Sequence, residues 1–229
     1  MEQRKKEYKR LLRGLPIDRE LFSIVIDNSD ILSYKRKFEE HAKKWKYCRQ
    51  KYAAGKADIE IKGIIPLFAY PFFVAGNIVG YEDVAKQFKI YNPEYKAQKE
   101  KECRKYGFSY EEWIDGRLYQ FYTGFLRECY FIICVFEIFP NQDLVIEKSF
   151  QKDFKENIDL VLNFPQAKIP IGMSNNGKTS DKYNKMRKNE KKKESTVFFT
   201  ASYACQIGDL NIINSIDIEN KIGNMLNAR

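Results

Sequence analysis

Histidine is almost absent from this 229-residue chain, which contains only His41. This removes most chemistry based on histidine pairs or triads, and the charged surroundings of His41 favour a surface role. The five cysteines are odd in number and form no CxxC pair. Neither a disulfide framework nor a zinc cluster is therefore indicated.

Long apolar runs are also missing, because polar residues or proline interrupt every apolar stretch well short of a membrane span. The first ten residues, MEQRKKEYKR, lack the apolar core of a signal peptide. The sequence therefore predicts a cytoplasmic protein without membrane contact. With 44% hydrophobic and 15% aromatic residues, the chain can form one sizeable core, alone or with a smaller appendage.

Positive charge is in excess, and it is clustered. The formal net charge is +9, which favours a polyanionic partner. Residues 178–193 contain eight Lys or Arg against two acids, a local net charge of +6. A second basic cluster lies within residues 1–51 and includes most of a helix expected over residues 31–52. The lysines of that helix are expected to face either a phosphate backbone or water.

The second half of the chain alternates helical and strand patterns. Ser109 and Glu112 form a capping-box pattern that starts a helix, and apolar residues at helical spacing predict a helix over 116–139. Further expected elements follow in order: strands over 143–149, 157–164 and 168–173 with a hairpin at 164–167, a turn at 175–177, a helix over 181–192, a strand over 195–201 and a helix over 216–226.

Three acids in this half have unusual positions. Asp159 opens an apolar strand, Asp153 lies in the loop before it, and Glu128 falls on or beside the apolar face of the preceding helix. A carboxylate in such a place is costly unless something pairs with it, often a metal. The alternatives are a solvated loop acid for Asp153, a strand-end cap for Asp159, and for Glu128 a position at the rim of the face or an ion pair with Arg127 or Arg117.

This order of elements and acids resembles the core of the PD-(D/E)XK nuclease superfamily, an α-β-β-β-α-β unit with a central mixed sheet. Over roughly residues 115–205, the stretches RLYQFYTGFLRECYFIICVFEIF, DLVIEKSFQKDFKENIDLVLNF and KIPIGMSNNGKTSDKYNKMRKNEKKK are most similar to type II restriction endonucleases of the TaqI kind. The resemblance implies an α/β (α+β) fold, with a restriction-endonuclease-like core at 115–229 whose mixed sheet is flanked by helices. Residues 1–114 would form a mainly helical region for DNA contact, dimerisation or core packing.

The resemblance also assigns roles to the three acids. Asp159 is implied as the principal metal ligand, Asp153 as the supporting acid, and Glu128 as the acid of the first core helix. Hard oxygen ligands of this kind suit Mg²⁺, with Mn²⁺ as a substitute. A metal held there would neutralise charge on a phosphodiester and activate the attacking water.

One part of the family pattern is missing from the third strand. The (D/E)-x-K motif is expected over residues 171–174, but Gly172 stands in place of the acid and Ser174 in place of the lysine. Lys178, just past the expected turn, is the first substitute for the catalytic lysine, and Lys168 is the second. The departure bears on catalysis more than on the fold.

The resemblance implies Mg²⁺-dependent, sequence-specific cleavage of double-stranded DNA by a type II restriction enzyme that acts as a homodimer. A catalytically inactive DNA-binding or accessory protein of a defence or mobile-element system is the alternative, and an unrelated α/β binding protein whose charge aids solubility is a third. Side chains suited to phosphates or base edges surround the expected turn and basic helix: Asn175, Asn176, Lys178, Ser180, Lys182, Lys185, Arg187 and Lys188.

Overall fold

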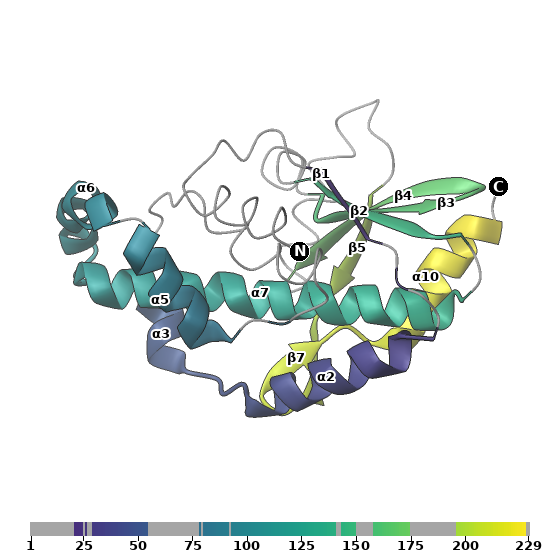
Figure 1. The fold of residues 1–229 in the computed structure, drawn as a ribbon, viewed down its shortest axis with the longest axis horizontal. Coiled ribbons are helices and arrows are strands. Elements are labelled where there is room, and N and C mark those ends of the chain that lie inside the picture. Colours follow the sequence, from purple (N-terminus) through teal and green to yellow (C-terminus); the bar gives the residue numbers. More distant parts are fainter. Residues whose placement is uncertain are drawn as a thin grey trace. The chain divides into compact units, whose positions relative to one another are not determined.

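The computed structural model, whose helices and strands are drawn in Figure 1, divides into two compact units. Among the described residues, the first unit contains residues 46–125, and the second contains residues 21–45 and 126–227. The functional regions expected at 1–114 and 115–229 stay a prediction. The structure describes residues 21–24, 26, 29–54, 78, 80–91, 93–140, 143–149, 158–174 and 196–227.

Helices make up the described part of the first unit. They are α3 (Arg49–Ala54), α5 (Tyr81–Tyr91), α6 (Pro93–Lys105) and the first half of α7 (Tyr110–Ile138). The helix α6 begins at Pro93, and proline is well suited to the first turn of a helix. Among the helices described here, none is long and apolar enough to cross a membrane.

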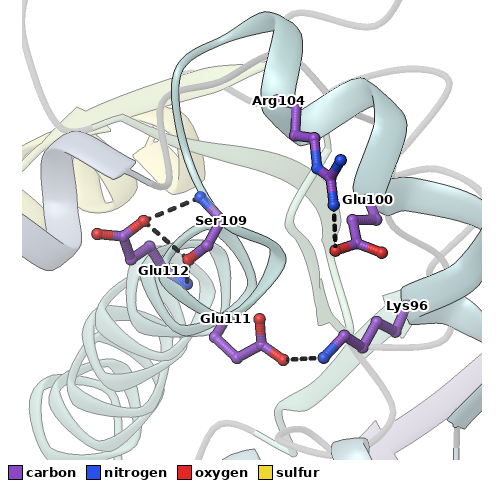
Figure 2. A network of polar contacts seen from close by, with 6 residues as sticks. All are labelled: Lys96, Glu100, Arg104, Ser109, Glu111 and Glu112. Carbon is purple, nitrogen blue, oxygen red and sulfur yellow. Dashed lines mark hydrogen bonds and ion pairs between the residues drawn. The ribbon is translucent and has the colours of Figure 1, made fainter.

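The predicted capping box at the start of α7 is confirmed (Figure 2). The backbone N–H of Glu112 donates to Ser109 Oγ at 3.2 Å, and the Glu112 carboxylate accepts from the Ser109 N–H at 2.9 Å. The bond from the Ser109 N–H is the main reason why the pKa of Glu112 is lowered, and a second bond from the Ser109 hydroxyl lowers it further. The helix that starts here continues without a break to Ile138, so the helix expected over 116–139 is the larger part of α7.

The second unit is built on a mixed sheet. The expected strands over 143–149, 157–164, 168–173 and 195–201 are confirmed, and Phe164 pairs with Ala167 across the expected hairpin. Neighbouring strands are antiparallel except for β4 and β5, which are parallel. The coarse expectation of an α+β fold with a mixed sheet is therefore confirmed. The sheet has the order β1 (Leu21–Ile24), β2 (Val145–Ser149), β3 (Leu160–Phe164), β4 (Ala167–Ser174) and β5 (Val197–Thr200).

The second half of α7 lies at the centre of this unit. Every residue from Phe131 to Phe136 is buried, so this half of the helix is covered on nearly all sides. The ring of Phe131 packs on Phe199 of β5, with 5.0 Å between ring centroids. On another side, the Tyr130 ring packs on Phe38 of α2 (Ile31–Lys44) at 5.6 Å. Residues projecting from α7 therefore meet both the sheet and α2.

A small hairpin and a final helix complete the second unit. Neither β6 (Ser202–Ile207) nor β7 (Leu210–Ile212) was expected from the sequence, whereas α10 (Ser215–Asn227) confirms the helix over 216–226. Gly208 turns the hairpin with a φ of +58°. A Cβ atom there would also lie 3.2 Å from the Ala42 carbonyl oxygen of α2. Both the positive φ and this close contact therefore favour glycine at the turn.

The single helix expected over 31–52 is wrong. The helix α2 ends at Lys44, and Trp45 is extended, with φ −68° and ψ 129°. The next residues are held by the Tyr119 hydroxyl, which accepts from the Cys48 N–H at 2.7 Å and donates to the Lys46 carbonyl at 2.9 Å. These two bonds replace the helical hydrogen bonds that the break removes.

Candidate functional site

A buried ion pair links α7 to the sheet. The Lys148 ammonium of β2 lies 2.7 Å from the Glu128 carboxylate of α7, and their side chains are 1% and 15% exposed. The same ammonium donates to the backbone carbonyl oxygen of Asp159 at 3.3 Å. Lys148 thus connects the acid of the helix to the residue that precedes β3.

The position of Lys148 follows from strand alternation. Leu144, Ile146 and Lys148 are all buried, as expected for residues two apart that share one face of a strand. Ile146 lies opposite Leu162 of β3, which is also buried, so Lys148 projects from the buried face of the sheet. The signal was present in the sequence as a lysine in register with two apolar residues, but the sequence interpretation concentrated on acids and missed it.

Asp159 lies immediately before β3 and is bound to β4. Its N–H donates to the Ile171 carbonyl at 2.8 Å, and its carboxylate oxygen Oδ2 accepts from the Met173 N–H at 2.5 Å. Asp159 therefore acts as a strand-end cap, the structural alternative to a metal ligand. The two roles are compatible, because a carboxylate has two oxygens and about four acceptor positions.

The structure brings together two of the residues expected at the site. Glu128 and Asp159 both bind Lys148, one through its carboxylate and the other through its backbone. Arg127, one of the two arginines named as alternative ion-pair partners of Glu128, donates to the Asn211 carbonyl at 2.9 Å. The other expected site residues lie outside the described part of the chain: Asp153, Asn175, Asn176, Lys178, Ser180, Lys182, Lys185, Arg187 and Lys188.

Gly172, where the resemblance expects an acid, has no room for a side chain. It pairs with Phe198 of β5, and a Cβ atom on Gly172 would lie 2.4 Å from Cε1 of the Phe198 ring. An aromatic ring therefore fills the space of the missing carboxylate. Lys168, the second substitute lysine, is exposed near the opposite end of β4, about 17 Å along the strand from Met173.

Adding a methyl group to Gly172 is expected to lower the free energy of unfolding by about 1–3 kcal/mol, because the ring of Phe198 must move. Chemical denaturation of Gly172→Ala measures this cost. The matched control is Gly223→Ala in α10, where a Cβ meets nothing within 4 Å. That change should stabilise the protein by about 0.5–1 kcal/mol, as glycine in a helix interior is unfavourable. Equal effects in both variants would contradict the packing of Phe198 on Gly172.

Cys129 adjoins Glu128 on α7 and is buried. Burial, followed by the charge of Glu128, raises the pKa of the Cys129 thiol well above its ordinary value. The thiol is therefore neutral near pH 7, and since the thiolate is the reactive form, Cys129 contributes packing and not a nucleophile.

The acids that the structure describes fit a magnesium site only in part. Within the described ranges, no three His, Cys, Asp or Glu side chains group closely enough to hold a metal ion. Magnesium is commonly held by one or two carboxylates together with water and substrate phosphates, so Asp159 has the right chemistry. Glu128 has it too, but its carboxylate is bound to the Lys148 ammonium.

Comparisons with known proteins return no match. No protein-family model matches the chain, and neither the search of the curated proteins nor that of the solved structures found a significant match.

Proposed function

We propose that the protein is a Mg²⁺-dependent, sequence-specific double-stranded DNA endonuclease of the restriction type, acting as a cytoplasmic homodimer. The observation that carries the proposal is the convergence of Glu128 and Asp159 on one buried ammonium, Lys148. The element order α7-β2-β3-β4, followed by β5 parallel to β4, supports it as well. The nuclease core that the sequence resembles has these elements in the same order, with one more helix between β4 and β5. That helix, expected over 181–192, and the turn expected at 175–177 lie outside the described part of the chain.

Each residue of the site would have a distinct task. Asp159 would supply carboxylate oxygen to the metal while its bond to Met173 holds the side chain at the end of β4. Asp153 would be the second ligand, and Lys178 would stabilise charge on the phosphate. A bound magnesium ion would neutralise the phosphate and lower the pKa of the attacking water. Lys148 would position the Glu128 carboxylate through their ion pair.

The direct test is cleavage of long, mixed-sequence linear DNA in Mg²⁺, in Mn²⁺ and in EDTA, followed on a gel. We expect discrete bands in either metal and intact DNA in EDTA. Sequencing the ends of the bands would then give the recognition site. A metal-dependent smear would overturn sequence specificity, and intact DNA in all three conditions would overturn cleavage.

A second candidate function is DNA binding without cleavage, as an accessory protein with a nuclease-like fold. The packing of Phe198 over Gly172 favours it, because that ring excludes the acid that the family motif requires at this position. This candidate predicts DNA that shifts on a native gel but stays intact in every metal, with binding that weakens steeply as salt rises. A protein that shifts no DNA at moderate salt would contradict both candidates.

A further inference from the structure

The outward face of α2 is strongly basic. Arg36, Lys37, Lys43 and Lys44 are exposed on this helix, and Glu40 is its exposed acid. The opposite side of α2 is apolar and contributes buried residues to the second unit: Ile31, Phe38 and Ala42.

The remaining lysine of α2 has a structural partner. Lys35 donates two hydrogen bonds to the Glu137 carboxylate of α7, at 2.7 and 2.8 Å. By contrast, none of the four exposed cations forms an ion pair with a residue that the structure describes. His41 adds little charge near neutral pH, because burial and then the charge of Lys44 lower its pKa. The charge of the face therefore comes from the four exposed cations.

The four cations form two rows. Arg36 and Lys43 are seven residues apart, as are Lys37 and Lys44, so each pair spans two turns and about 10.5 Å along the helix axis. Residues at this spacing project in nearly the same direction. Two parallel rows of cations on one helix face form an extended surface, which suits a regularly repeating anion better than a single small one.

The helix dipole explains only half of this pattern. Cations in the last turn interact favourably with the negative end of the helix dipole, which accounts for Lys43 and Lys44. The effect falls off within one turn, so it gives no reason for Arg36 and Lys37 in the middle of the helix. The first turn of α2 also lacks the acids that would stabilise it. The exposed Glu40 is three or four residues from each of the four cations, but the structure shows no ion pair between it and any of them. A ligand contact accounts for all four cations together.

We infer that the exposed face of α2 binds the phosphate backbone of double-stranded DNA, outside the catalytic site and independently of base sequence. The inference rests on the proposed function in so far as DNA is the partner. Double-stranded DNA carries one negative charge about every 1.7 Å along its axis, so the two rows of cations would neutralise several phosphates at once. The surface would add affinity and orient the duplex, but it would not select a sequence.

The test compares two double variants that each remove two exposed cations. In Arg36→Gln/Lys43→Gln one row of α2 is neutralised, and in the matched control Lys101→Gln/Lys105→Gln the change lies on α6. Binding to a fluorescent 30-bp mixed-sequence duplex is measured by anisotropy in EDTA at several salt concentrations. Each lost phosphate contact reduces the slope of log K against log salt by about 0.9 in magnitude. The slope should therefore decrease by about 1.8 for the α2 variant and stay unchanged for the control.

Two further measurements keep the outcomes distinct. The second row, Lys37→Gln/Lys44→Gln, should give the same change in slope, and circular dichroism checks that every variant is folded. If wild-type protein binds the duplex and neither α2 variant differs from the α6 control, the inference is overturned while the proposed function stands. If wild-type protein binds no DNA even at low salt, both are overturned. Because EDTA is present throughout, loss of cleavage alone affects neither result.

Discussion

Replacing Lys148 by methionine is expected to lower the free energy of unfolding by about 3–5 kcal/mol. The lysine side chain is 1% exposed and its partner Glu128 is 15% exposed, so the pair lies largely away from water. Removing the ammonium leaves the Glu128 carboxylate buried without its counter-charge, and that desolvation cost is far larger than the lost packing of a methylene chain. Denaturant unfolding of Lys148→Met and wild type measures the difference directly.

A second ion pair on the same helix provides the control. Lys35 and Glu137 also join α7 to another element, at 2.7 Å, but their side chains are 33% and 35% exposed. Solvent screens such a pair, so Lys35→Met should cost only about 0–1 kcal/mol. The double variant Lys148→Met/Glu128→Leu should regain most of the stability that Lys148→Met loses. A loss below about 1 kcal/mol in Lys148→Met would show that water reaches the Glu128 carboxylate.

Local patterns were sufficient for much of the fold. The capping box at Ser109, the apolar helix that follows it and the hairpin at 164–167 each depend on residues close together in the chain. Their hydrogen bonds and buried faces are set by the sequence spacing itself. The prediction of these elements therefore needed no knowledge of the tertiary structure.

Elements that depend on distant partners were missed. The break after Lys44 is stabilised by Tyr119, 73 positions along the chain from Lys46, so the pattern around residues 31–52 could not show it. The strand β1 pairs with the distant strand β2, so that Leu21 lies opposite Ser149. The β6–β7 hairpin did carry a local signal, the two-residue Gly208-Asp209 loop between β-forming residues, and that signal was overlooked.

The site shows the same division between local and tertiary information. Strand patterning located Asp159 at the mouth of β3, but its bond to the Met173 N–H depends on the β3–β4 pairing. The sequence also showed that an acid was missing at Gly172. Only the packing of Phe198 gives the reason, since its ring occupies the space that a side chain at this position would need. The substitute lysines were sought on β4 and after it, whereas the buried lysine beside both acids comes from β2.

Asp159→Asn is expected to reduce metal-dependent DNA cleavage on the order of 10³-fold or more. A metal ion supplies several kcal/mol of charge stabilisation in the transition state, and each 1.36 kcal/mol corresponds to a factor of ten in rate. Asparagine keeps a side-chain oxygen that can accept the Met173 N–H, so the substitution removes the charge and keeps the strand-end cap. Single-turnover cleavage rates in saturating Mg²⁺ give the comparison.

The choice of asparagine separates the proposed metal-binding role of Asp159 from its role as a strand-end cap. Alanine would also leave the Met173 N–H without its acceptor, at a cost of about 1–3 kcal/mol, so lost activity could then reflect a damaged strand end. DNA affinity in EDTA and the melting temperature of Asp159→Asn should stay close to wild type, and Glu219→Gln, an exposed acid on α10, should cleave normally. An Asp159→Asn protein that cuts at the wild-type rate would leave Asp159 only its structural role, and the metal site would have to be sought elsewhere in the chain.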